Sequence, residues 1–137
     1  MMKAIMRIFA PLAVCVLLST GIAKAHETPE AEVAPVLKKA LADYPGKEIT
    51  MITVEYPPGS VDPVHRHNAH SFIYVLEGSI VMGVRGGKTV ALEKGDTFYE
   101  GPEDVHTVGR NASQTQSAKF LVVMLKNEGS PIVLPAH

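Results

Sequence analysis

The sequence predicts an all-β domain, a sandwich or a barrel, that is preceded by one short helix. Three observations support this fold class. From residue 47 onward, short segments rich in β-branched and aromatic residues alternate with turn residues about every eight to twelve positions. Before residue 46, apolar residues recur with the period of a helix. A chain of 137 residues with one cysteine is expected to form one domain that needs no disulfide.

The first 25 residues have the three parts of a secretory signal peptide. Lys3 and Arg7 give a positively charged start. Residues 8–22 carry no charge and lead to an Ala-Lys-Ala cleavage triplet that ends at Ala25. This uncharged stretch is shorter than the roughly 20 residues that a membrane-spanning helix needs. We therefore expect cleavage after Ala25 and export, to the periplasm in a Gram-negative bacterium and otherwise out of the cell.

Removal of this segment leaves one small acidic chain, residues 26–137. It holds ten basic and fourteen acidic side chains and no cysteine, because Cys15 lies in the signal peptide. Nucleic-acid-binding domains carry an excess of basic residues, so nucleic acid is not expected as a partner. We also expect no membrane span after the signal peptide is removed.

Residues 26–46 are expected to form an N-terminal helical segment. Pro35 is tolerated only in a first helical turn, so the helix would begin near Ala34 and end at the Tyr-Pro-Gly turn of residues 44–46. Apolar residues recur at helical spacing, and lysines occupy the other side: Val33, Val36, Leu37, Ala40 and Leu41 against Lys38 and Lys39.

Residues 47–137 are expected to form the β domain. Turn residues separate its predicted strands, which are residues 49–56, 71–76, 80–84, 89–92, 97–99, 105–108 and 119–126. The strand at residues 71–76 is apolar on both faces. Ser71, Ile73 and Val75 point one way, and Phe72, Tyr74 and Leu76 point the other way. Either the helix or a second copy of the chain must therefore cover the outer face, and the second case predicts a homodimer.

Three histidines form a candidate metal site. His65 and His67 are two positions apart, so on an extended chain they point to the same face about 7 Å from each other. His106 follows a turn and lies inside a short β segment. Imidazole is the commonest protein ligand of zinc, copper, iron and nickel. The alternative is that each histidine is an ordinary surface or hydrogen-bonded side chain.

The residues around these histidines resemble both sequence motifs of the cupin family. The first motif is matched by Gly59, His65, His67 and Gly78, and the second by Gly95, Asp96 and His106, with Pro102 and Asn111 each later than usual. The likeness covers residues 47–125. It implies a small single-domain cupin of type 2, a double-stranded β-helix or jelly roll that holds a metal inside its barrel.

One position departs from the cupin pattern. Ser71 stands where the first cupin motif usually has glutamate. Three neutral imidazoles without a carboxylate favour iron, copper, zinc or nickel over harder ions, and they leave coordination positions open for water, oxygen or a substrate. Ser71 could hydrogen-bond a metal-bound water.

Two further residues are candidate ligands. His70 would point away from Ser71 unless a bulge turned it inward, and otherwise it is a surface or dimer-contact residue. Glu100 directly precedes the turn that leads to His106, and it is either a pocket residue or a solvated carboxylate of the turn.

The resemblance implies an exported metal-binding cupin and leaves two classes of function open. One is a metal-dependent oxygenase, such as a dioxygenase, or an isomerase that acts on a small molecule. The other is a non-catalytic module that binds a metal or a small ligand. The cupin fold does not decide between them, because it hosts many activities. The sequence identifies no acid–base pair and therefore no catalytic residue.

Overall fold

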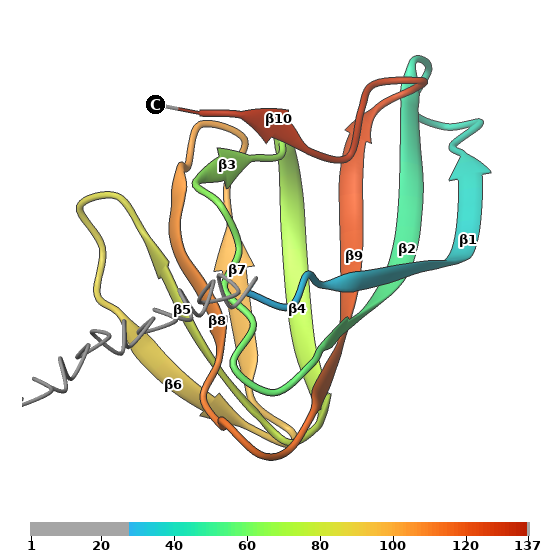
Figure 1. The fold of residues 1–137 in the computed structure, drawn as a ribbon. Helices are drawn as coiled ribbons and strands as arrows, with labels where there is room; N and C mark the ends of the chain where they lie inside the picture. The colour runs from blue at the N-terminus through green and yellow to red at the C-terminus, as the bar shows by residue number, and fades with distance from the viewer. Residues whose placement is uncertain (1–27, 137) are drawn as a thin grey trace, which may run out of the picture.

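The computed structural model describes residues 28–136, which form two antiparallel five-stranded sheets (Figure 1). The strand order is β1-β2-β9-β4-β7 in the first sheet and β10-β3-β8-β5-β6 in the second. The strands are β1 (Glu32–Ala40), β2 (Lys47–Tyr56), β3 (His65–Arg66), β4 (Ala69–Glu77), β5 (Ser79–Val84), β6 (Val90–Glu93), β7 (Thr97–Glu100), β8 (His106–Asn111), β9 (Ala118–Asn127) and β10 (Leu134–Pro135). The fold is the jelly roll that the sequence predicted.

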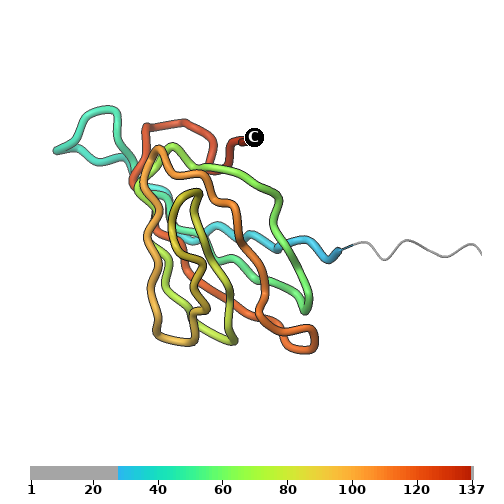
Figure 2. Tube along the Cα trace, turned by 90° about the vertical axis from the view of Figure 1, so that its left-hand side faces the viewer, coloured from blue at the N-terminus to red at the C-terminus, as the bar shows by residue number. Residues whose placement is uncertain are grey.

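The predicted signal peptide lies outside the described residues. Within residues 28–136, no helix is long and apolar enough to cross a membrane. Figure 2 shows that the loop after β1 and the segment that follows β9 meet at one end of the molecule. A backbone hydrogen bond from the Glu128 amide to the Gly46 carbonyl oxygen, 2.9 Å long, joins these two loops.

The predicted N-terminal helix is wrong. Residues 32–40 form the edge strand β1, which pairs with β2 from Glu32 opposite Glu55 to Ala40 opposite Glu48 (Figure 1). A register irregularity lies between Pro35 and Leu37. Edge strands and bulges are the places where a sheet accepts proline. The irregularity also interrupts the strict alternation of a strand, which is why the apolar residues of this segment imitate a helical stripe.

The hydrophobic core lies between the two sheets. Alternate residues of the long central strands point inward, because successive side chains of a strand lie on opposite faces. Those that are buried include Ile52, Val54 and Tyr56 of β2, Ile73 and Val75 of β4, and Phe120, Val122 and Met124 of β9. Strand β5 adds Ile80 and Met82 from the second sheet. Most of these residues, though neither Val75 nor Ile80, line the cavity at the candidate metal site.

The outer face of β4 and β7 is apolar and exposed. Ser71, Ile73 and Val75 point inward as predicted. Phe72 is 51% exposed and Tyr74 46% exposed on the other side of β4. The neighbouring strand β7 adds Tyr99, whose ring lies 5.4 Å from that of Phe72, centre to centre, and which is also exposed. Because residues 32–40 are a strand at the far edge of the sheet, no helix covers this face in the described chain.

A glycine makes the corner where the chain passes from the first sheet to the second. Gly78 joins β4 to β5 with a φ of +68°, which L side chains rarely adopt. A Cβ at this position would lie 2.6 Å from the carbonyl oxygen of Ser117, so there is also no room for one. The corner sets how the second sheet faces the first.

Asn111, the late asparagine of the second motif, holds the loops at one end of the barrel. Its Nδ2 donates to the carbonyl oxygens of Tyr56 at 2.9 Å, Pro57 at 3.1 Å and Gln116 at 2.8 Å. Its Oδ1 accepts a hydrogen bond from the Ser113 amide at 2.8 Å. Asn111 is buried, so these bonds satisfy a side chain that would otherwise be costly to remove from water.

Candidate metal centre

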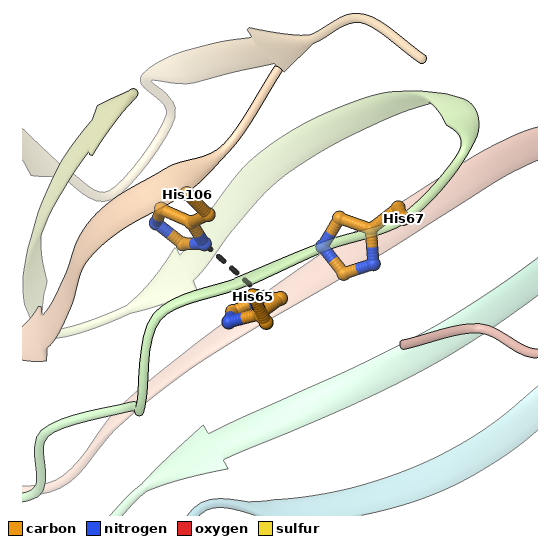
Figure 3. A group of neighbouring side chains, drawn as sticks. All are labelled: His65, His67 and His106. Carbon is orange, nitrogen blue, oxygen red and sulfur yellow. Dashed lines mark hydrogen bonds between the residues drawn. The ribbon is translucent and has the colours of Figure 1, made fainter. Parts of the chain in front are cut away.

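His65, His67 and His106 come together inside the barrel (Figure 3). His65 begins β3 and His106 begins β8, and the two residues are direct partners across these paired strands. His67 follows β3 immediately. One nitrogen atom from each ring lies within 4.8 Å of the other two. The structure therefore brings together the three histidines that the sequence singled out.

Backbone carbonyls fix the orientation of two of the rings. The Nδ1 of His65 donates to the carbonyl oxygen of Pro63 at 2.8 Å, and the Nδ1 of His67 donates to that of Ile132 at 2.5 Å. A carbonyl oxygen can only accept, so Nδ1 carries the proton in each ring. In the neutral ring, Nε2 then presents a lone pair to the centre. Metal-binding histidines are commonly held by this kind of second hydrogen bond.

Glu100 completes the group of polar atoms at the centre. Its Oε2 lies 3.2 Å from Nε2 of His67, and its Oε1 lies 3.3 Å from Nδ1 of His106. Glu100 ends β7 and is 3% exposed. Of the two alternatives left by the sequence, the structure therefore supports the pocket residue and excludes the solvated turn carboxylate.

The donor atoms at this point fit a bound cation. Nδ1 of His106 also lies 3.3 Å from Nε2 of His65, so ring nitrogens and carboxylate oxygens converge on one buried place. Lone pairs that face one another away from water are costly unless a positive charge lies between them. Imidazole nitrogen suits iron, copper, zinc and nickel. Close by on the inner face of β4, Ser71 is fully buried, and its Oγ has no hydrogen-bond partner in the described chain.

His70 does not join the centre. It is exposed on the outer face of β4, and its Nδ1 lies 2.7 Å from the Tyr99 hydroxyl. The irregularity in the pairing of β4 with β9 lies between Val75 and Glu77, so no bulge turns His70 inward. The hypothesis that His70 replaces the missing cupin ligand is therefore wrong, because strict alternation places it opposite Ser71.

A cavity of about 390 Å³ opens onto the centre. Its polar lining includes the three histidines and Glu100, and most of its other walls are apolar. The apolar walls come from both sheets and from the segments near the two ends of the described chain, and they include Val33, Ile52, Val54, Met82, Phe120, Val122, Met124 and Ile132. A mainly apolar pocket with a few converging polar groups is typical of a small-molecule site.

Sequence reasoning missed a second polar pair in this cavity, Tyr56 and Asp62. The Tyr56 hydroxyl donates a hydrogen bond to Oδ2 of Asp62. The Asp62 amide donates to the Gly109 carbonyl oxygen at 2.8 Å, which anchors the loop before β3. A Cβ on Gly109 would lie 2.9 Å from Cε1 of His106 and 3.0 Å from the Tyr56 hydroxyl. The absence of a side chain at Gly109 thus makes room for the pair beside the histidines.

Tyr56 and Asp62 were missed because the proximity of a loop to a strand end cannot be read from spacing. The available signal was weak. Tyr56 is an inward position of an alternating strand, and Asp62 lies three residues before His65. Burial raises the pKa of Tyr56, and the negative charge of Asp62 raises it further, so the phenol stays protonated.

In the metal-free centre, burial and charge act in opposite directions. Burial acts to lower the pKa of His67, but its hydrogen bonds with Glu100 and Ile132 raise it above the usual value. Burial acts to raise the pKa of Glu100, but the hydrogen bond from His67 and the charge of His106 lower it. Burial lowers the pKa of His106 even though Glu100 is close. Without metal, these directions favour a protonated His67 beside an ionised Glu100.

The shifts in the pKa values of His67, Glu100 and His106 determine how the stability of the metal-free protein depends on pH. The raised pKa of His67 adds stability that is complete below its usual value of 6.5 and is lost as pH rises through the folded-state pKa. The lowered pKa of Glu100 adds stability that is complete above its usual value of 4.5 and is lost as pH falls through the folded-state pKa. The pair therefore contributes most between pH 4.5 and 6.5. His106, whose pKa is lowered, loses its contribution as pH falls below 6.5.

Comparison with known proteins supports the same fold. The sequence model of the cupin domain family matches residues 52–124. The pectin degradation protein KdgF of Dickeya dadantii is 28% identical over 83 residues, which are 60% of this chain and 74% of KdgF.

Solved structures with low sequence identity share the architecture. The Schizosaccharomyces pombe Cnp3 cupin domain is 17% identical, with a TM-score of 0.58 over 71% of this chain and 61% of that one. A cupin domain of Bordetella pertussis is 20% identical, with a TM-score of 0.57 over 73% of this chain and 97% of that one. Oxalate oxidase in complex with the substrate analogue glycolate is 23% identical, with a TM-score of 0.58 over 76% and 54%. At these identities the likeness shows the fold alone.

The proton shared by His67 and Glu100 gives a prediction for the metal-free protein. We expect the Glu100→Gln substitution to lower the pKa of His67 from its raised value, because the amide removes the carboxylate charge that opposes the effect of burial. Glu55→Gln is the matched control, since Glu55 is only partly buried and its ion-pair partner is Lys119. Nitrogen-15 NMR titration of the imidazoles measures both. An unchanged pKa of His67 in Glu100→Gln would contradict the contact between them.

Proposed function

Because the chain belongs to the cupin family, we propose that it binds one divalent transition metal ion through His65, His67 and His106. The observation that carries this proposal is the convergence of three ring nitrogens within 4.8 Å inside the barrel. A nitrogen-rich donor set favours iron, copper, zinc or nickel. When bound, such an ion supplies a Lewis acid with coordination positions open to a ligand oxygen.

The ligand of the proposed site is a small molecule with an apolar body and an oxygen donor. The cavity of about 390 Å³ has the size of a small-molecule site. Its apolar walls suit the body of the molecule, and the histidines lie where an oxygen donor would reach the metal. This combination fits a small aromatic or aliphatic acid, alcohol or ketone better than a molecule that is polar on every side.

We propose that the protein is an enzyme, a metal-dependent oxygenase or isomerase. The specific observation in favour is the Tyr56–Asp62 pair, because it adds a proton donor and a carboxylate to the cavity beside the histidines. The Asp62 carboxylate can take a proton from a bound molecule, while the hydrogen bond from the Tyr56 hydroxyl holds this carboxylate in place. The name of one similar protein, a pectin degradation protein, is compatible with degradative chemistry.

The alternative is a non-catalytic module that binds a metal or a small ligand. It is favoured by the way in which Tyr56 and Asp62 satisfy each other, which is also what a purely structural pair would do. Turnover decides between the two functions, since a binding module holds its metal and ligand without converting the ligand.

We also propose export and self-association. Export rests on the charged start, uncharged stretch and Ala-Lys-Ala triplet of residues 1–25. Self-association rests on the exposed aromatic face of β4 and β7, which Phe72, Tyr74 and Tyr99 share. The sequence left two covers for this face, a helix or a second copy, and the structure removes the helix. The exposed aromatic side chains of this face support a homodimer that buries them.

The metal content of the purified chain tests the main proposal. We expect about one metal ion per chain when residues 26–137 are purified without chelator or nickel resin. The His67→Ala substitution is expected to weaken binding by more than the roughly 10–100-fold that loss of an outer hydrogen-bond partner costs, because it removes a ligand. His70→Ala is the matched control, since His70 lies on the outer face and should leave the metal content unchanged.

The identity of the metal then selects the activity assay. Iron or copper calls for oxygen-consumption measurements, and zinc or nickel calls for isomerase and hydrolase screens. Tight metal binding without turnover across a broad substrate panel would contradict the proposed enzymatic activity and support the binding module. Absence of metal from wild type and control, even after reconstitution, would overturn the metal site.

Native mass spectrometry tests export and self-association together. We expect the full-length chain, produced in a secreting host, to give a species with twice the mass of residues 26–137. The Phe72→Glu substitution should yield a monomer, because a charge in the buried centre of an interface is costly. Tyr44→Glu, at an exposed turn away from this face, is the control. A monomeric wild type would refute the dimer, and an unprocessed mass would refute cleavage after Ala25.

A further inference from the structure

We propose that Glu100 is the fourth protein ligand of the metal centre, supplied by strand β7 in place of the carboxylate that cupins usually carry at position 71. This inference rests on the proposed three-histidine site and deepens it. It changes the donor set from three neutral imidazoles to three imidazoles and one carboxylate. Four observations support it: the position of the carboxylate, its burial without a basic partner, the register of the strands and the nature of Ser71.

The carboxylate of Glu100 lies among the three rings. Oε2 is 3.2 Å from Nε2 of His67, and Oε1 is 3.3 Å from Nδ1 of His106. The two oxygens thus face nitrogens of two different histidines, and these are the ring atoms on the side of the centre. A carboxylate that served the surrounding structure would face backbone amides or a basic side chain instead. The position of Glu100 is the position of a ligand.

The burial of Glu100 requires a positive charge nearby. The side chain is almost fully buried, and in the described part of the chain it forms ion pairs with His67 and His106 but with no lysine or arginine. A buried carboxylate is costly unless it is paired or coordinates a metal. Glu48, the other buried glutamate, has a basic partner in Lys126. A metal ion would supply to Glu100 the charge that Lys126 supplies to Glu48.

The strand register explains why a residue of β7 reaches the cupin ligand position. Ser71 of β4 and Glu100 of β7 are direct partners in the antiparallel ladder. Directly paired residues point to the same face of a sheet, with Cβ atoms about 4.5–5.5 Å apart. The long side chain of Glu100 therefore enters the same part of the barrel that a glutamate at position 71 would enter from the neighbouring strand.

Ser71 allows the carboxylate to come from β7 instead of β4. Ser71 is fully buried, and its Oγ has no hydrogen-bond partner in the described chain. Its small side chain leaves room for the Glu100 carboxylate. Two glutamates at these paired positions would place two like charges in one buried site, which is unfavourable. Of the two paired positions, 71 and 100, only position 100 on β7 carries a carboxylate.

A fourth, negatively charged ligand lowers the net charge of the metal centre. Three neutral imidazoles leave a divalent ion with its full charge inside an apolar barrel, whereas Glu100 halves that charge. Burying less net charge costs less free energy, so the carboxylate should strengthen binding of every divalent ion. The site then equals in composition the one that a cupin builds with its own motif glutamate, although Ser71 occupies that position.

Cobalt(II) binding to the purified metal-free protein tests the inference. Competition titration gives the dissociation constant, and the visible d–d absorption of the bound ion reports its ligands. We expect Glu100→Gln to weaken cobalt binding by roughly 100-fold or more, above the range for loss of an outer hydrogen-bond partner, and to change the absorption spectrum. The Glu55→Gln substitution, at a partly buried glutamate of β2 that pairs with Lys119, should leave both the affinity and the spectrum unchanged.

Moving the carboxylate back to β4 provides the second variant. We expect Ser71→Glu combined with Glu100→Ser to recover most of the affinity that Glu100→Gln loses, because the paired positions share one face. Circular dichroism of each variant shows that the fold is retained. Recovery supports a ligand role, since a residue that only oriented His67 or His106 could not be replaced from the other strand.

The outcomes separate this inference from the proposed function. Cobalt binding that is unchanged in Glu100→Gln but lost in His67→Ala would overturn the fourth ligand and leave the three-histidine site intact. A weaker affinity with an unchanged spectrum would also overturn it, since it would make Glu100 a positioning residue. No cobalt binding by the wild type would overturn both proposals.

Discussion

The convergence of nitrogen and oxygen lone pairs on one buried point is the constraint that the rest of the site depends on. Ring nitrogens of three histidines and the carboxylate of Glu100 meet inside the barrel, where they are largely removed from water. Such an arrangement is stable only around a positive charge. In the metal-free protein, the raised pKa of His67 beside Glu100 favours a protonated imidazole in this role, and we propose that a metal ion takes it in the loaded protein.

The fold supplies this convergence through pairing of strands that are distant in the sequence. The β3–β8 pair sets His65 beside His106, and the β4–β7 pair sets Glu100 beside Ser71. The carbonyl oxygen of Ile132, near the end of the chain, orients His67. Apolar residues of β2, β4 and β9 surround the site, and this apolar environment makes each charge interaction stronger than it would be in water. The same walls form the cavity for a small molecule.

The sequence predicted the features that depend on local pattern. Segments of β-branched and aromatic residues between turn residues indicated the long strands β2, β4 and β9, and the spacing of the histidines indicated the three side chains that converge inside the barrel. It failed at residues 32–40, where an irregularity beside Pro35 gave an edge strand the apolar period of a helix. It could not decide the place of Glu100 or find the Tyr56–Asp62 pair, because both depend on which strands and loops become neighbours. Register between strands is a tertiary property that a single sequence does not display.

A crystal structure of the metal-loaded protein, with anomalous diffraction at the absorption edge of the metal, would show directly whether the three histidines hold the ion. We expect one metal ion among His65, His67 and His106, with nitrogen–metal distances of about 2.0–2.1 Å if the ion is zinc. A structure from metal-saturated crystals in which the ion lies elsewhere, while His67 keeps its hydrogen bond to Glu100, would contradict it. In that case a proton shared by His67 and Glu100, rather than a metal ion, would be what stabilises these buried groups.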